Sequence, residues 1–171
     1  PSLDGPRKFE VRVVEKSIVN AFAAPGGTIV FFSGLIDQAE SAEEVAGVLA
    51  HEMAHVVHRH GTQALVRHFA LSTILTLVTG NDWGVGTVAS STGQMLLHLA
   101  HSRAAEAEAD AAAVRILQAA RVSSDGLTRF MARQEKIRPA GDRIAALHYL
   151  DSHPSLAERR EALARIGIEG P

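Results

Sequence analysis

Four histidines and one glutamate occur within ten residues, HEMAHVVHRH, at positions 51–60. The first five letters fit the pattern H-E-x-x-H, with His51 and His55 four residues apart. On a helix, such residues differ by about 40° around the axis and about 6 Å along it, so both imidazoles can bind one zinc ion. Glu52 projects from the same turn, where its carboxylate can act on a metal-bound water as a general base without being a ligand.

A third ligand decides the class of zinc site. Metzincins use H-E-x-x-H-x-x-G-x-x-H, but here position 58 is histidine and position 61 is glycine. While the helix continues, His58 lies about 10 Å along the axis from His51, which is too far to share one ion comfortably. We therefore expect His58 and His60 to have supporting, capping or surface roles near the helix end.

A second predicted helix offers a better candidate. The segment SRAAEAEAD, residues 102–110, puts Glu106 and Asp110 on one helix face, whereas Glu108 points to another side. Glu106 would complete a two-histidine, one-glutamate site with one position open for water. Asp110 could accept a hydrogen bond from a ligating imidazole and fix its tautomer. The competing interpretation is a solvated histidine-rich helix, with Glu106 as an ordinary surface side chain.

Local patterns predict the helices that carry these residues. Residues 41–44, Ser-Ala-Glu-Glu, have the form of a capping box and precede apolar residues at three- and four-residue spacing. This indicates an amphipathic helix that contains residues 51–60. The alanine-rich segment 103–120 is a second strong helix former. Residues 123–125, Ser-Ser-Asp, can cap a third helix.

Strand patterns precede these helices in the chain. Residues 8–15, KFEVRVVE, alternate apolar and charged side chains, which predicts a half-buried strand. The runs IVNAFAA and TIVFFS flank Pro25-Gly26-Gly27, a hairpin signal because glycine readily adopts positive φ. Strands followed by helices indicate an α+β domain, mainly helical with a small N-terminal antiparallel sheet.

Length and composition narrow the possibilities. The chain has 171 residues, 46% hydrophobic and 21% charged, which is typical of one globular domain over residues 1–171. With 17 basic and 19 acidic residues, the charge predicts no nucleic-acid partner. The absence of cysteine excludes thiolate zinc sites and cysteine nucleophiles. The most apolar stretch, residues 69–78, is shorter than the ~20 residues that span a bilayer, so we expect a buried helix or a hydrophobic lip.

The ordered set of motifs resembles the HtpX-like zinc metallopeptidases, a family that also includes CAAX prenyl endopeptidases and BepA-type periplasmic quality-control proteases. The resemblance covers roughly residues 9 to 165. It rests on NAFAAPGG at 20–27, HEMAH at 51–55, S-R-x-x-E-x-x-A-D at 102–110, and His153-Pro154 followed by Glu158-Arg159. Such an ordered set is more specific than any single motif. It implies a zincin-like, gluzincin fold with one Zn²⁺ per chain.

The resemblance also implies site residues. It makes His51, His55 and Glu106 the zinc ligands, Glu52 the general base and Asp110 a partner of a ligand. It gives His153 two alternative roles, donating to the oxyanion or closing over zinc as a reversible fourth ligand in a latent state. Arg159 matches the family arginine and is the other candidate for stabilising negative charge. Residues similar to the family's substrate-side edge, where a peptide can add as a strand, are Asn20, Ala21, Phe22, Gly26 and Gly27.

The resulting hypothesis is a zinc-dependent endopeptidase that cleaves unfolded, membrane or envelope proteins in quality control. The resemblance suggests a bacterial periplasm or cell envelope, and membrane association would require segments outside this sequence. The competing hypothesis is a non-catalytic or latent chaperone-like module with a structural zinc, in which the hairpin edge and residues 69–78 hold polypeptide. A closed site that includes His153 would favour the second hypothesis without excluding a latent protease.

Overall fold

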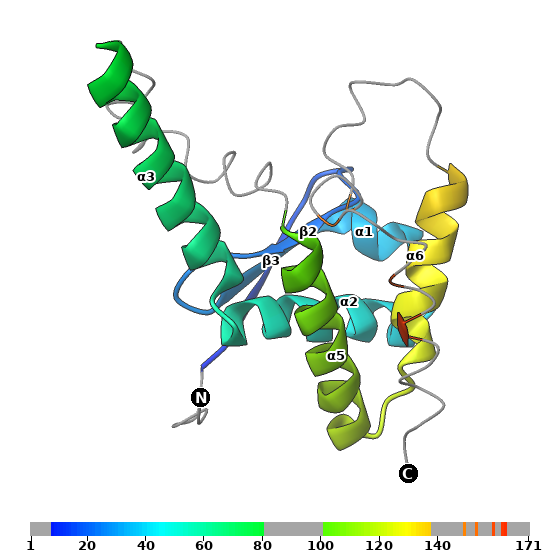
Figure 1. The fold of residues 1–171 in the computed structure, drawn as a ribbon. Helices are drawn as coiled ribbons and strands as arrows, with labels where there is room; N and C mark the ends of the chain where they lie inside the picture. Colours follow the sequence, from blue (N-terminus) through cyan, green and yellow to red (C-terminus); the bar gives the residue numbers. More distant parts are fainter. Residues whose placement is uncertain are drawn as a thin grey trace.

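The computed structural model describes residues 8–80 and 101–137, together with five further residues: Tyr149, His153, Arg159, Ala162 and Leu163. In this part of the chain, strands β1 (Glu10–Val14), β2 (Ala21–Ala23) and β3 (Thr28–Phe32) are followed by helices (Figure 1). The helices are α1 (Ser33–Gln38), α2 (Ala42–Val57), α3 (His60–Thr79), α5 (Arg103–Ala120) and α6 (Asp125–Ile137). This order confirms the predicted fold class, a mainly helical domain with a small N-terminal sheet.

The sheet has the order β1-β3-β2. Strands β2 and β3 are antiparallel, which confirms the predicted hairpin, and Gly26 and Gly27 adopt φ values of 95° and 98° in its turn. The sheet is mixed rather than wholly antiparallel, because β1 pairs in parallel with β3. The hairpin sends β3 back in the direction of β1, and β3 then lies between the other two strands.

Strand β1 forms where it was predicted, but it is not half-buried. All five of its residues are exposed, and Val13 retains 61% of its accessible surface. The reason is its position at the sheet edge, since the described helices pack mainly against β2 and β3. The alternating pattern therefore gave the correct secondary structure and the wrong burial.

Helix α2 is the centre of the described fold. It packs against α5 and α6 and also contacts β2, so that it lies between the sheet and the other helices (Figure 1). It lies close to the start of α6, where a Cβ atom added at Gly126 would lie 2.1 Å from the Glu43 carbonyl oxygen. Fully buried side chains around α2 include Ile29, Leu35, Val48, Leu127 and Phe130.

The helix starts agree with the predictions, although one cap differs. Ser41 is the N-cap of α2, but its side chain makes no capping hydrogen bond. The Glu44 carboxylate instead accepts a 3.0 Å hydrogen bond from the Glu40 backbone and two from Arg133 of α6. The capping box was therefore wrong in its hydrogen bonds, because a tertiary ion pair takes its glutamate. The Ser123 hydroxyl accepts from the Asp125 backbone at the start of α6.

Helix α3 contains the apolar stretch and extends away from α2 and the sheet (Figure 1). The prediction of a buried helix was wrong, because Leu71, Ile74, Leu77 and Val78 are exposed, with Leu77 retaining 80% of its surface. The alternative prediction of a hydrophobic lip is compatible with this exposure. Among the residues that the structure describes, no helix is both long and apolar enough to cross a membrane.

Candidate metal centre

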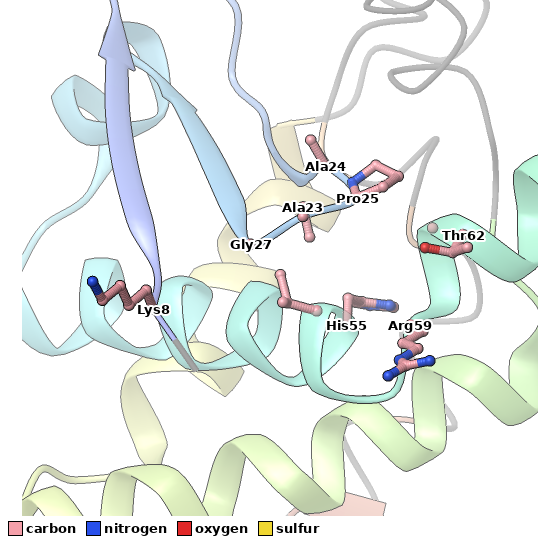
Figure 2. Close-up of a pocket in the computed structure, with 11 residues that line it drawn as sticks. Lys8, Ala23, Ala24, Pro25, Gly27, His55, Arg59 and Thr62 are labelled. Atoms are coloured by element: carbon pink, nitrogen blue, oxygen red, sulfur yellow. The ribbon is translucent and has the colours of Figure 1, made fainter. Parts of the chain in front are cut away.

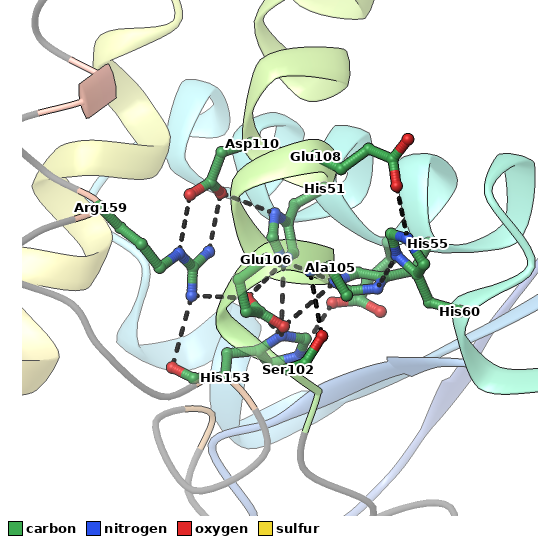
Figure 3. Close-up of polar contacts among 11 residues, drawn as sticks. His51, His55, His60, Ser102, Ala105, Glu106, Glu108, Asp110, His153 and Arg159 are labelled. Carbon is green, nitrogen blue, oxygen red and sulfur yellow. Dashed lines mark hydrogen bonds and ion pairs between the residues drawn. The ribbon is translucent and has the colours of Figure 1, made fainter. Parts of the chain in front are cut away.

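The packing of α2 against α5 brings the H-E-x-x-H residues to Glu106 (Figure 3). The Nε2 atoms of His51 and His55 lie 2.9 Å apart. The Glu106 carboxylate places Oε2 3.3 Å from His51 Nε2 and Oε1 3.5 Å from His55 Nε2. Glu106 lies in the first turn of α5, which is capped by the Ser102 hydroxyl accepting from the Ala105 backbone.

His153 adds a fourth donor to this cluster. Its Nδ1 atom lies 3.3 Å from His51 Nε2 and 3.1 and 3.2 Å from the two oxygens of Glu106. One ligand atom from each of His51, His55, Glu106 and His153 lies within 4.8 Å of the others, and all four residues are buried. Two or three imidazoles with one carboxylate are a typical donor set for zinc, so the cluster fits one such ion.

Glu52 lies beside the cluster, and its carboxylate is unusual because it is buried without a hydrogen-bond partner in the described part of the chain. The residue is fully buried, and neither carboxylate oxygen has a hydrogen-bond partner among the described residues. Its nearest ionic contact is His153 Nε2, 3.3 Å from Oε1. Burying a carboxylate without hydrogen bonds is unfavourable, so these oxygens fit a group that receives a proton from a bound water molecule.

Asp110 and Arg159 lie on the side of His51 that faces away from the cluster. Asp110 Oδ1 lies 3.0 Å from His51 Nδ1, the ring nitrogen that faces away from the cluster. Arg159 donates to both oxygens of Asp110 and also pairs with Glu106 Oε2 at 2.6 Å. Figure 3 shows this chain running from Arg159 through Asp110 to His51. The structure thus places Arg159 on carboxylates that orient the cluster, which suits a positioning role.

The charges inside the cluster shift the pKa values of its carboxyl groups. Burial raises the pKa of Glu106. The charges of His153 and His51 and their hydrogen bonds to the carboxylate lower this pKa by a larger amount, so that the net pKa is well below the usual range. Burial also raises the pKa of Asp110, and the hydrogen bonds from Arg159 and His51 outweigh this and lower it. Both groups are therefore carboxylates at neutral pH, the form that can bind a cation or hold an imidazole N–H.

The imidazoles are shifted in opposite directions. Burial, with the neighbouring histidines, lowers the pKa of His55 well below its usual range, which keeps the ring neutral and able to donate a lone pair. Burial lowers the pKa of His153 too, but the carboxylates of Glu106 and Glu52 outweigh it and raise the pKa to about 9. A protonated His153 beside Glu52 can donate a hydrogen bond to an anion in the cluster.

His60 contacts the rear of His55. Its Nδ1 atom lies 3.0 Å from His55 Nδ1, and its Nε2 atom lies 3.1 Å from Glu108 Oε2. His58 is the C-cap of α2 and lies outside the four-residue cluster. These positions agree with the supporting and capping roles expected for the two histidines.

Two aromatic neighbours were missed by the sequence reasoning. The ring of His101 stacks on His55 with centroids 4.1 Å apart, and the ring of Tyr149 stacks on His153 at 4.4 Å. The Tyr149 backbone also donates to Val19 O, tying this region to the chain before β2. The available signals were the place of His101 just before the S-R-x-x-E motif and the four-residue spacing from Tyr149 to His153.

The predicted substrate edge lies next to the cluster rather than in it. Strand β2 is at one edge of the described sheet, and a cavity of about 390 Å³ opens between its hairpin and the α2–α3 junction (Figure 2). Gly26, Gly27 and His55 are among the lining residues. Asn20 and Ala21 are buried, with Asn20 Oδ1 accepting from the Ala21 backbone, and Phe22 is half-buried.

Comparison with known proteins gives a family match. A model of the family described as Peptidase family M48 matches residues 2–166 of this chain. This match covers α2, α5 and the positions of His153 and Arg159.

Three curated proteins illustrate the similarity. The chain is 32% identical over 160 residues to "Mitochondrial metalloendopeptidase OMA1" of Arabidopsis thaliana, covering 94% of this chain and 32% of that protein. It is 32% identical over 159 residues to "Metalloprotease LoiP" of Escherichia coli, covering 89% and 60%. It is 29% identical over 135 residues to "Putative beta-barrel assembly-enhancing protease" of Vibrio cholerae, covering 73% and 28%. The chain thus spans less than two thirds of the length of each relative.

Proposed function

The chain belongs to peptidase family M48, and on that basis we propose that it is a zinc-dependent endopeptidase acting on protein substrates. In this proposal His51, His55 and Glu106 hold one Zn²⁺, and Glu52 is the general base. The observation that carries it is the buried Glu52 carboxylate, which lacks a hydrogen-bond partner among the described residues and lies beside clustered metal donors. A merely structural metal site has no use for such a group.

The mechanism assigns a proton path to this chain's own side chains. A zinc ion held by His51, His55 and Glu106 would lower the pKa of a water molecule and polarise the scissile carbonyl. Glu52 accepts the proton of the attacking water on a carboxylate oxygen and passes it to the leaving amine. His153, whose Nε2 lies 3.3 Å from Glu52, donates a hydrogen bond to the negative oxygen that develops on the substrate. Arg159 and Asp110 hold His51 in place.

The β2 edge and the adjacent cavity support an extended mode of substrate binding. A peptide that adds to β2 through main-chain hydrogen bonds runs past His55, one of the cavity-lining residues. The positive φ of Gly26 and Gly27 shapes the end of this edge. In this proposal Asn20 and Ala21, being buried, fix the strand, and the half-buried Phe22 contacts the peptide.

The test compares Glu52→Gln with the parent protein. Zinc content by elemental analysis and cleavage of an unfolded protein substrate are measured on both. We expect Glu52→Gln to retain about one zinc per chain while hydrolysis falls by at least 10²-fold, within the usual contribution of a general base. Undiminished hydrolysis in Glu52→Gln would refute the assignment. Asp125→Asn, an exposed carboxylate at the start of α6, is the matched control.

The position of His153 supports a second candidate, a latent or non-catalytic polypeptide-binding module. With His153 Nδ1 inside the donor cluster, all four positions around a zinc ion can be filled by protein. Such a protein would bind unfolded polypeptide without cutting it. Assays of binding and of cleavage, each with and without a chelator, separate the two: a metal-dependent loss of intact substrate favours the protease.

The relatives' names leave more than one cellular setting open. The similar protein of Vibrio cholerae is called a putative beta-barrel assembly-enhancing protease, and other relatives are called mitochondrial. From the motif resemblance we propose protein quality control in the periplasm or cell envelope as the setting of this activity. Fractionation of cells that make the intact protein, with detection of this domain, tests that placement.

A further inference from the structure

A second group of metal donors lies at the C-terminal end of α2. His58 Nδ1 lies 3.0 Å from Glu108 Oε1, and His60 Nε2 lies 3.1 Å from Glu108 Oε2. One ligand atom from each of these three residues lies within 4.8 Å of the others. The rings of His58 and His60 are nearly parallel, at 15°, with centroids 5.4 Å apart.

This group has the chemistry of a cation site. Zinc bonds of about 2.0–2.2 Å in a tetrahedral site put ligand atoms roughly 3.3 Å apart, close to the separations between each histidine and Glu108. Two imidazoles and one carboxylate are suitable ligands for zinc and similar transition metals. The C-terminus of α2 adds the negative end of its helix dipole, since His58 is the C-cap.

The group is more open than the catalytic cluster. His60 is buried, but the His58 side chain is 25% exposed and that of Glu108 is 55% exposed. An ion here would keep at least one water ligand, and its long carboxylate partner would lose side-chain freedom on binding. Its affinity should therefore be lower than that of the buried cluster.

We propose that His58, His60 and Glu108 form a second site for a divalent transition metal, separate from the four-residue cluster. Nε2 of His60 faces Glu108 and is the atom that would bind the ion, while Nδ1 faces His55.

The experiment measures zinc stoichiometry on the metal-depleted chain by equilibrium dialysis and elemental analysis. We expect two zinc ions per parent chain, the second binding at least tenfold more weakly, and one per chain in His58→Ala. His68→Ala removes an exposed histidine of α3 outside the group and should still bind two. His51→Ala should lose the tighter ion and keep the weaker one, so that failure of the catalytic assignment is seen separately.

One zinc per parent chain, or two in His58→Ala, would overturn the second site, with the group then being only a set of hydrogen bonds.

Discussion

Arg159 donates two hydrogen bonds of 2.7 Å to the two carboxylate oxygens of Asp110, one from Nε and one from Nη2. The geometry is bidentate, and both side chains are buried. Because Asp110 Oδ1 also lies 3.0 Å from His51 Nδ1, the arginine fixes the carboxylate that fixes the imidazole. A contact remote in sequence thereby sets the direction of a proposed metal ligand.

Asp110→Asn should weaken zinc binding by about 10- to 100-fold, because the amide is a poorer acceptor for the His51 ring N–H and breaks the ion pair with Arg159. Competition with a chromogenic chelator measures the affinity. Asp125→Asn, which changes an exposed carboxylate, serves as the control and should leave it unchanged. An unchanged zinc affinity in Asp110→Asn would show that Asp110 does not position His51.

Glu44 and Glu40 provide a matched pair around one guanidinium. Arg133 pairs with the buried carboxylate of Glu44 and also with Glu40, whose side chain is 73% exposed. Glu44→Gln should lower the free energy of unfolding by about 2 kcal/mol, because it leaves a charged donor poorly paired. Glu40→Gln should cost less than about 1 kcal/mol. Urea unfolding of both variants measures the two values, and equal losses would contradict the role of burial.

The same ion pair predicts a dependence on pH. The hydrogen bond from Arg133, against the opposing effect of burial, holds the pKa of Glu44 below its ordinary value of 4.5. A group with a depressed folded pKa contributes its full stability above the unfolded pKa and loses it as the pH falls through the folded pKa. The stability difference between the parent and Glu44→Gln should therefore be constant near neutral pH and shrink below about pH 4.5. A stability difference that stays constant down to pH 3 would contradict this prediction.

Much of the site could be predicted because its signals are local. The four-residue spacing of His51 and His55 and the spacing of Glu106 and Asp110 follow from helical geometry, and both helices form. The predicted helix over residues 51–60 was wrong at its end, because α2 stops at Val57 and Arg59 adopts a φ of 56° before α3 begins. The pairing of the two helices was inferred from chemistry, since two histidines need a third ligand. Local periodicity contains no direct information about that pairing.

What could not be predicted depends on which elements are neighbours. The exposure of Val13 and of Leu77 depends on whether another segment covers them, and the sequence of β1 or α3 does not state this. Glu44 was predicted to cap α2 because the local sequence does not reveal its actual partner, Arg133, which is 89 residues away. His101 was missed for the same reason, since its ring meets His55 only after α2 and α5 have packed.

Gly126→Ala should destabilise the fold by about 1–3 kcal/mol. A Cβ atom there would lie 2.1 Å from the Glu43 carbonyl oxygen, so α6 would have to move away from α2. Alanine is otherwise the better helix residue by about 1 kcal/mol, and a net loss would thus reflect the close approach. Thermal unfolding measures it. The control is Gln118→Ala, at an exposed position of α5, which should change stability by less than about 0.5 kcal/mol. A Gly126→Ala variant as stable as the parent would contradict the close packing of α6 against α2.

Zinc should stabilise the folded chain, because it binds a donor cluster that the unfolded chain does not assemble. At a free concentration about 100 times the dissociation constant, the gain is about 2.7 kcal/mol. For a domain of this size, that corresponds to a rise in Tm of roughly 5–10 °C. Differential scanning fluorimetry with buffered zinc and with a chelator measures the shift. His51→Ala should lose most of the response, since it removes a donor from the buried cluster, whereas His68→Ala should keep it. An equal Tm with and without zinc in the parent would mean that the cluster does not hold the ion in the folded state.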